Sequence, residues 1–181
     1  LLGVIQRFFA TEVVPLGVPY MEQLTPRAGD FNGDGTDDYV GQCGDSVAVV
    51  LGNSGRVHAR VVSYLPPRAG AYGEGVATDI NGDGHADYAV GNRSAANHLS
   101  VYYGNGDGTF GPVTNIPVGP WPHGIVPIDV DGDADMDIVN VNQGSDNLSL
   151  MINNGSGVFG APTFFNSGVG GEWGLATGDM N

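Results

Sequence analysis

The chain has 181 residues, 31 of them glycine, and carries a formal net charge of −14 at pH 7. So much glycine excludes long helices, because each interior glycine costs about 1 kcal/mol relative to alanine, and it favours an all-β chain with many tight turns. The acidity excludes nucleic acid and anionic membrane surfaces as partners, and no apolar run is long enough to insert into a membrane.

The first elements in chain order belong to two successive repeats. Residues 1–9 align with residues 102–110, so the chain is predicted to open at the third strand of a repeat. An acidic window at 30–38 then begins a complete repeat. It is followed by an alternating strand pattern at 46–51, a Gly/Asn turn and a further predicted strand at 57–63.

The same order of features recurs along the rest of the chain. New acidic windows begin at Asp79, Asp129 and Asp179, so the interval between them is 49–50 residues. Evenly spaced self-similarity of this kind indicates a repeat architecture. Predicted strands follow the second and third windows at 99–103, 110–116, 148–152 and 158–165.

Each period thus contains about four short strands joined by tight turns, which is the unit of a β-propeller blade. The predicted fold class is all-β, with blades of four antiparallel strands and about 50 residues per repeat. The chain covers about 3.5 blades, as a partial propeller or as one completed by other chains. Its single domain, 1–181, divides into the end of a preceding blade at 1–23, blades at 24–72, 73–122 and 123–172, and the start of the next blade at 173–181.

The acidic windows carry the candidate chemistry. They follow the pattern D-x-[DN]-x-D-G-x-x-D, which offers side-chain oxygens at positions 1, 3, 5 and 9 and a backbone carbonyl at position 7. A set of 6–7 hard oxygen ligands suits Ca²⁺, about one ion for each of the three complete loops. The predicted ligands are Asp30, Asn32, Asp34, Thr36 and Asp38; Asp79, Asn81, Asp83, His85 and Asp87; Asp129, Asp131, Asp133, Asp135 and Asp137; and, in a fourth half-loop, Asp179 and Asn181.

Two features qualify the calcium prediction. The third loop has Ala134 where the others have glycine, and an alanine forced to positive φ costs on the order of 1 kcal/mol, so a distorted turn is expected there. Asp/Asn/Gly turns also occur without a metal, but three aligned copies favour the metal interpretation.

An EF-hand is excluded because it needs a glutamate at position 12, which here is Gly41, Val90 and Asn140.

The segments Asp30–Gly35 (DFNGDG) and Gly104–Pro112 (GNGDGTFGP) resemble FG-GAP/VCBS repeats, the blade family shared with the integrin α-subunit head. The resemblance implies a propeller with calcium in the loops at the blade edge. It also implies secreted or surface proteins with adhesive, lectin-like or scaffold roles. The repeat is found beside enzymes as well, including polysaccharide-degrading ones.

No catalytic motif is present, so the chain is predicted not to be an enzyme. The expected function is a non-catalytic, calcium-binding repeat module for adhesion, scaffolding or ligand binding. Its expected partner is a protein or carbohydrate ligand at the cell surface or matrix, with self-association or attachment to further blades as an additional contact. An extracellular location is expected, because sites binding calcium at roughly 10 μM fill at extracellular calcium levels and stay empty at cytosolic ones.

Two alternatives remain open: a carbohydrate-binding propeller lectin, and the propeller portion of a polysaccharide-active enzyme. The candidate ligand-binding residues are Trp121, His123 and Trp173, whose rings could stack on sugars. The competing interpretation is that these rings pack one blade against the next, and this interpretation is favoured.

Overall fold

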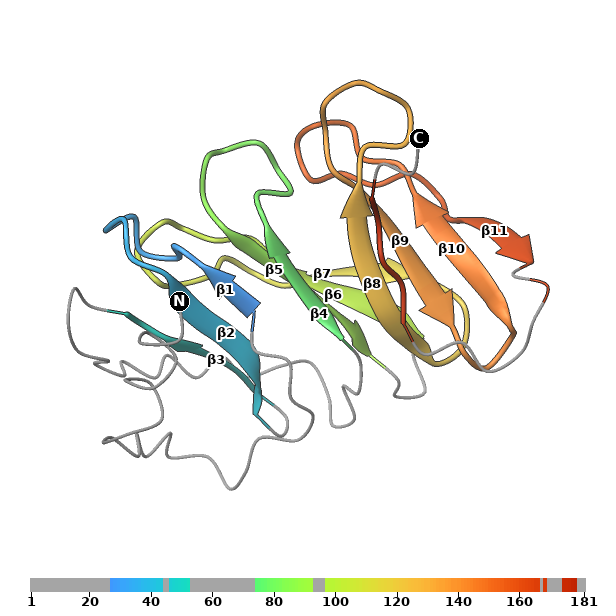
Figure 1. The fold of residues 1–181 in the computed structure, drawn as a ribbon, viewed down its shortest axis with the longest axis horizontal. Coiled ribbons are helices and arrows are strands. Elements are labelled where there is room, and N and C mark those ends of the chain that lie inside the picture. Colours follow the sequence, from blue (N-terminus) through green and yellow to red (C-terminus); the bar gives the residue numbers. More distant parts are fainter. Residues whose placement is uncertain are drawn as a thin grey trace.

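A computed structural model describes residues 27–43, 46–52, 74–92, 97–166, 168 and 174–178. Within them the strands form three antiparallel sheets that stand side by side (Figure 1). The first sheet contains β1 (Arg27–Gly29), β2 (Asp38–Cys43) and β3 (Ser46–Val50). The second contains β4 (Gly75–Thr78), β5 (Asp87–Asn92), β6 (His98–Tyr102) and β7 (Thr114–Pro117). The third contains β8 (Pro122–Ile128), β9 (Asp137–Asn142), β10 (Asn147–Met151) and β11 (Thr163–Asn166).

Each sheet is a simple meander, because its strands pair in the order in which they occur along the chain. The second and third sheets have the four strands predicted for a blade, and the all-β partial propeller is confirmed. The predicted strand at 57–63 lies outside the described residues. No helix in the described part of the chain is long and apolar enough to cross a membrane.

The last strand of each four-stranded sheet is shorter than the sequence pattern predicts. β7 and β11 begin only at Thr114 and Thr163, whereas strands at 110–116 and 158–165 were expected. A proline precedes each strand: Pro112 lies two residues before Thr114, and Pro162 lies immediately before Thr163. A proline has no N–H to donate to the ladder, so regular pairing resumes only beyond it.

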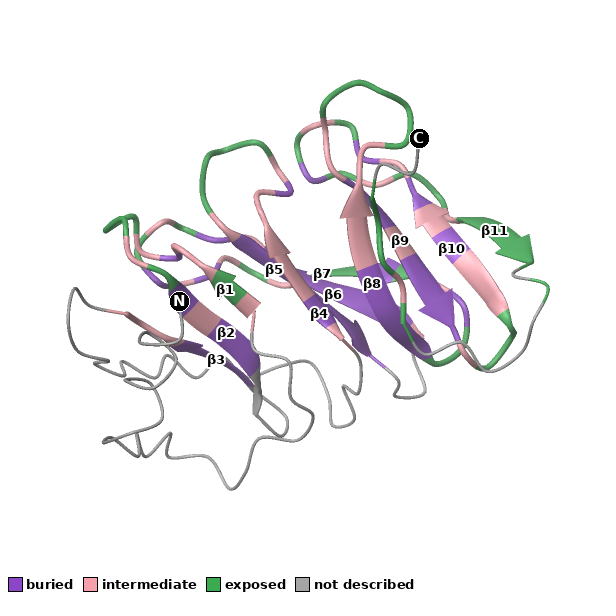
Figure 2. Ribbon diagram, in the orientation of Figure 1, coloured by how far each residue is buried: buried purple, intermediate pink, exposed green. Residues whose placement is uncertain are grey.

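The core lies between the sheets. In the first interface, apolar residues of sheet 1 pack against the aromatic face of sheet 2, and in the second the far face of sheet 2 packs against sheet 3. Figure 2 shows the buried central strands of all three sheets. The first cluster contains Phe31, Val40, Val47, Val49, Tyr88, Val90, Tyr102 and Phe110. The second contains Ile80, Ala89, Leu99, Val101, Ile116, Ile125, Ile138 and Met151.

The two interfaces fill one pair of equivalent positions with side chains of different sizes. Tyr88 of sheet 2 lies over Gly75, where an added Cβ would clash with the hydroxyl end of the tyrosine ring, 2.4 Å from its oxygen. Ile138 and Ile125 occupy the same two positions in sheet 3. A large ring above a glycine in one blade is thus replaced by two branched aliphatic side chains in the next, which keeps the interface filled.

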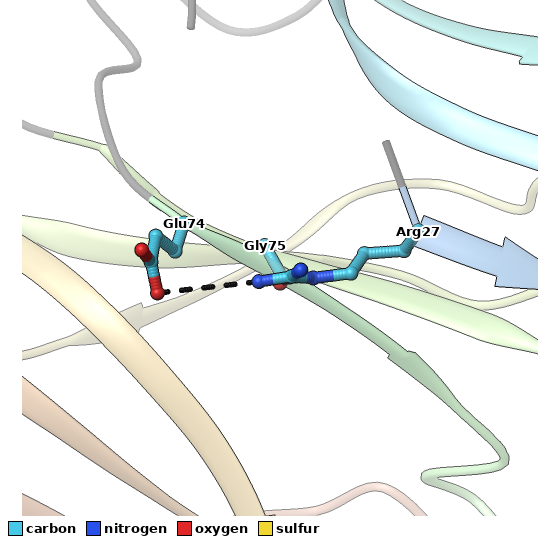
Figure 3. A network of polar contacts seen from close by, with 3 residues as sticks. All are labelled: Arg27, Glu74 and Gly75. Atoms are coloured by element: carbon cyan, nitrogen blue, oxygen red, sulfur yellow. Dashed lines mark hydrogen bonds and ion pairs between the residues drawn. The ribbon is translucent and has the colours of Figure 1, made fainter. Parts of the chain in front are cut away.

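The first strands of neighbouring sheets are also joined by polar contacts. Arg27 of β1 reaches across to β4, where its Nε donates to the carbonyl of Gly75 and its Nη2 lies 4.0 Å from Glu74 Oε2 (Figure 3). Both charged side chains are about one-third exposed, so the ion pair itself contributes little.

Candidate metal centre

The three acidic windows fold into loops with the same hydrogen-bond pattern. In the first loop the position-1 carboxylate of Asp30 accepts the N–H groups of Gly33 at 2.7 Å and of Gly35 at 2.8 Å. The aspartates at position 1 of the other loops, Asp79 and Asp129, accept the equivalent pair of N–H groups. The backbone therefore curls around the first aspartate in every repeat.

The residue at position 3 differs between the loops, whereas position 5 is an aspartate in all three. In the first two loops position 3 is an asparagine, and its amide nitrogen donates to the position-5 carboxylate: Asn32 to Asp34 at 3.3 Å and Asn81 to Asp83 at 2.9 Å. In the third loop position 3 is Asp131, which has no amide to offer. The third loop therefore has two carboxylates at positions 3 and 5, where the first two loops pair an amide with a carboxylate.

The third loop brings together the oxygen atoms that a cation needs. Oxygen atoms from Asp129, Asp131 and Asp137 all lie within 4.8 Å of one another, and in the described part of the chain no other group of three acidic, histidine or cysteine side chains does so. The donors are all hard carboxylate oxygens, which suits Ca²⁺ rather than a soft-ligand metal. An aspartate triad that could hold a metal ion is therefore present.

Ala134 does adopt the left-handed conformation that the pattern requires, with φ of 74°. The expected distortion of the turn is wrong, since Ala134 donates to Asp129 at 3.1 Å as Gly84 donates to Asp79 at 2.8 Å. The loop keeps its shape and Ala134 carries the backbone strain.

Position 9 has a second role that the sequence pattern did not reveal. Asp38 is fully buried, and its carboxylate accepts one N–H from Phe31 at 2.9 Å and another from Gly52 at 2.6 Å. It thereby ties the start of the loop to the end of β3. The equivalent donors are Ile80 and Gly104 for Asp87, and Val130 and Asn153 for Asp137.

The electrostatics of the loops follow from this geometry. Burial raises the pKa of Asp38 and of Asp87 above the ordinary value, although backbone N–H groups partly offset it. Desolvation raises the pKa of Asp131, and so do the negative charges of Asp133 and Asp137. Desolvation opposes a low pKa for Asp30, but four backbone hydrogen bonds outweigh it and lower the value.

The first and second loops also touch the Gly/Asn turn of the following blade. Gly108 N of sheet 2 donates to the carbonyl of Phe31 in the first loop at 2.7 Å. Asn153 Nδ2 of sheet 3 donates to the carbonyl of Ile80 in the second loop at 2.6 Å. Within the second blade, His85 of the loop packs on Gly106 of the turn. Together these contacts make loops and turns alternate along one edge of the blades.

Comparison with known sequences identifies the repeat. A family model described as FG-GAP-like repeat matches residues 30–90 and 79–140, which together cover more than half of the chain. The chain belongs to the FG-GAP-like repeat family. No curated protein sequence is significantly similar to it.

This FG-GAP-like chain is also similar to a solved structure. The structure is that of an Agrocybe aegerita lectin, described as specifically recognising non-reducing terminal N-acetylglucosamine. The two align with a TM-score of 0.58 and 24% identity over 77% of this chain and 37% of the lectin chain. At this identity the likeness shows a shared fold, and this chain spans little more than a third of the lectin chain.

The candidate ligand-binding residues are only partly gathered by the FG-GAP-like fold. Trp121 is 52% exposed and has a φ of 56°, whereas His123 on β8 is buried. The backbone of Trp121 is held by both neighbouring blades, because its N–H donates to Asn97 Oδ1 at 3.4 Å and its carbonyl accepts from Gln143 N at 3.1 Å.

The surface is hollowed along the same edge of sheet 3. The turn that begins at Gln143 continues into the wall of an open depression of about 460 Å³, lined among others by Ser145, Asp146 and Phe164. Trp173 and the fourth half-loop at Asp179 and Asn181 lie outside the described residues.

Proposed function

We propose that this chain is a non-catalytic, calcium-stabilised repeat module that presents a ligand-binding surface outside the cell, in adhesion or scaffolding. The observation that carries the proposal is the carboxylate triad of Asp129, Asp131 and Asp137 within a loop shape repeated three times. The first two loops have the same shape, and their asparagines would turn the amide oxygen toward a bound ion.

Calcium has a structural consequence in this proposal. A site that binds at roughly 10 μM in millimolar calcium adds about 2.7 kcal/mol of stability. Three such sites would contribute about as much as the whole stability of a typical domain. The same arithmetic supports an extracellular location, because cytosolic calcium would leave sites of this affinity empty.

Calorimetric titration of the purified chain with Ca²⁺ tests the proposal. We expect uptake of about one ion per complete loop, with Mg²⁺ competing weakly because it demands tighter octahedral geometry. Asp131→Asn should weaken one site, while Asp37→Asn should leave uptake unchanged, since Asp37 is an exposed acid of the first window at a non-ligand position. Absence of calcium uptake by the folded chain would refute the proposal.

Carbohydrate is the second candidate ligand, and Trp121 is the observation that favours it. Half-exposed rings of this kind stack on sugar faces, and a bulky residue at positive φ stores strain of about 1–3 kcal/mol, which often marks a functional site. The fold likeness to a lectin that recognises N-acetylglucosamine supports the same class of ligand.

Glycan-array binding in saturating calcium tests this candidate. Trp121→Ala should abolish binding and Trp121→Tyr should retain most of it, because a tyrosine ring still stacks. Val158→Ala is the matched control, since Val158 is 62% exposed but lies in a hairpin turn away from Trp121. If no glycan is retained, or if Trp121→Ala binds like the natural chain, carbohydrate is the wrong ligand. Turnover of any polysaccharide by the chain would instead overturn its non-catalytic assignment.

A further inference from the structure

The sequence contains four Asn-Gly pairs, and they fall at two places of the repeat. Asn32-Gly33 and Asn81-Gly82 occupy positions 3 and 4 of acidic windows, whereas Asn105-Gly106 and Asn154-Gly155 lie in Gly/Asn turns. An Asn-Gly pair can modify itself, because the backbone nitrogen of a glycine, which has no Cβ in the way, can attack the side-chain amide before it. The fold decides how the attacking nitrogen and the attacked carbonyl are held in each pair.

In the acidic windows the attacking nitrogen is already engaged. The N–H of Gly33 donates to Asp30 Oδ1 at 2.7 Å, and the N–H of Gly82 donates to Asp79 Oδ1 at 2.8 Å. Attack by either nitrogen would break a hydrogen bond to a charged carboxylate and pull the glycine out of the curl around the first aspartate. The loops therefore protect the asparagines at position 3.

The turn of sheet 3 holds Asn154 in the opposite way. The side-chain Oδ1 of Asn154 accepts hydrogen bonds from Ser156 N at 3.1 Å, Ser156 Oγ at 2.8 Å and Val158 N at 3.2 Å. Two of these donors are backbone N–H groups, so the carbonyl oxygen of the amide, and not its NH₂, must face them. Such donors stabilise the negative charge that develops on Oδ1 when Cγ is attacked, as an oxyanion hole does.

The nucleophile and the leaving group at Asn154 are both accessible. Within the described part of the chain the N–H of Gly155 forms no hydrogen bond that attack would have to break. The side chain of Asn154 is exposed, so its NH₂ can leave into water. This pair thus combines an available nitrogen with an activated carbonyl.

The equivalent turn of sheet 2 is less suited to the reaction. The amide nitrogen of Asn105 donates to Thr109 Oγ1 at 2.8 Å, which holds the leaving group. Asp107 stands where the other turn has Ser156, so a carboxylate replaces the hydroxyl donor beside the developing charge. A Cβ on Gly106 would collide with the ring of His85, which shows that this ring covers the glycine.

We propose that Asn154 is a self-modification site, where the turn of sheet 3 promotes conversion of the asparagine to aspartate and isoaspartate. The nitrogen of Gly155 forms a bond to Cγ of Asn154 and gives its proton to water, while the side-chain NH₂ takes a proton from water and leaves as ammonia. Water then opens the five-membered succinimide at either carbonyl. The net reaction consumes one water and releases one ammonia, and it requires neither calcium nor a sugar.

The modified residue lies where two blades meet. A Cβ on Gly82 of the second loop would lie 3.1 Å from the carbonyl oxygen of Gly155, and a Cβ on Gly155 would collide with the carboxylate of Asp135. Isoaspartate at 154 inserts a methylene group into the main chain directly before Gly155. Modification should therefore displace this turn from the second loop and weaken the contact between the second and third blades.

Peptide mapping by mass spectrometry of the full chain, aged in mildly alkaline buffer, tests the proposal. We expect Asn154 to deamidate about tenfold or more faster than Asn32 and Asn81, with isoaspartate among the products. The same mapping in urea is the control. All four pairs lose their folded geometry there, so their rates should agree within about threefold.

Two variants separate the turn from the Asn-Gly pair itself. Ser156→Ala removes the hydroxyl donor and should slow the reaction at Asn154 in the folded chain by about threefold or more. Ser156→Thr keeps a hydroxyl and should retain the natural rate, and neither variant should change the rate in urea. The proposal is overturned if Asn154 reacts no faster than Asn32 in the folded chain, or if Ser156→Ala reacts there as fast as the natural chain.

Discussion

At the scale of single residues, Ala134 shows how a loop tolerates an imperfect sequence. The backbone adopts φ of 74° and keeps its hydrogen bond to Asp129, so the cost is local strain rather than a lost contact. Gly84 occupies the equivalent position with φ of 87° and has no neighbouring atom within 4 Å of a hypothetical Cβ. The two positions therefore form a matched pair in which only backbone strain changes.

Ala134→Gly should stabilise the chain by about 0.5–1 kcal/mol, because relief of the left-handed strain exceeds the extra entropy that glycine loses on folding. Gly84→Ala should destabilise it by a similar amount. Urea denaturation of both variants, in chelator so that metal affinity does not enter, measures the difference. If Ala134→Gly is less stable than the natural chain, Ala134 is unstrained.

The aspartate at position 9 of the third loop should behave differently from the aspartate at its position 3. The carboxylate of Asp137 accepts the N–H groups of Val130 and Asn153. In Asp137→Asn the amide NH₂ would face one of these N–H groups, which would then lose its acceptor. We expect a loss of about 2–3 kcal/mol even when chelator is present. Asp131→Asn should lower calcium affinity but leave stability in chelator nearly unchanged, since Asp131 is exposed. Equal losses in chelator would contradict a structural role for position 9.

At the scale of elements, the contact between a loop and the next turn depends on one buried asparagine. Asn153 is 2% exposed and donates to the carbonyls of Ile80 at 2.6 Å and Met136 at 3.1 Å, so it joins two blades. Asn153→Ala should cost about 2–4 kcal/mol, because buried partners lose their hydrogen bonds. Asn154→Ala in the same turn should cost under about 1 kcal/mol, since Asn154 is exposed and bonds only locally. Equal melting temperatures for the two variants would contradict the role of Asn153 in joining the blades.

Spacing alone predicted most of the elements but not how they meet. The interval between acidic windows predicted the blades, the alternation predicted β6 and β10, and the oxygen pattern predicted the loops. The late start of β7 and β11 depends on prolines whose effect on pairing shows only once the register is known. Asp38 accepts hydrogen bonds from Phe31, seven positions before it, and from Gly52, 14 positions after it. These contacts exist only in the folded loop, so no local sequence pattern could predict them.

At the scale of the whole molecule, loops and interfaces form one connected structure. The position-2 residue of a loop places its side chain in the interface and its carbonyl on the next blade's turn, as Phe31 does with Gly108. Its N–H meanwhile bonds to Asp38 of its own loop. A cation that orders a loop therefore also orders the surface on which the following blade rests.

This connection predicts a response to calcium removal beyond the loops themselves. Hydrogen exchange at the amide of Gly108 should accelerate on chelation, because that N–H donates to Phe31 in the preceding blade at 2.7 Å. The amide of Gly111 should change little, since it donates to Tyr103 within its own turn at 2.8 Å. Exchange measured by NMR with and without chelator separates the two amides. Equal acceleration at both would indicate general unfolding of the second blade. No change at Gly108, with calcium binding established by calorimetry, would show that the loops hold their ions without transmitting order to the neighbouring blade.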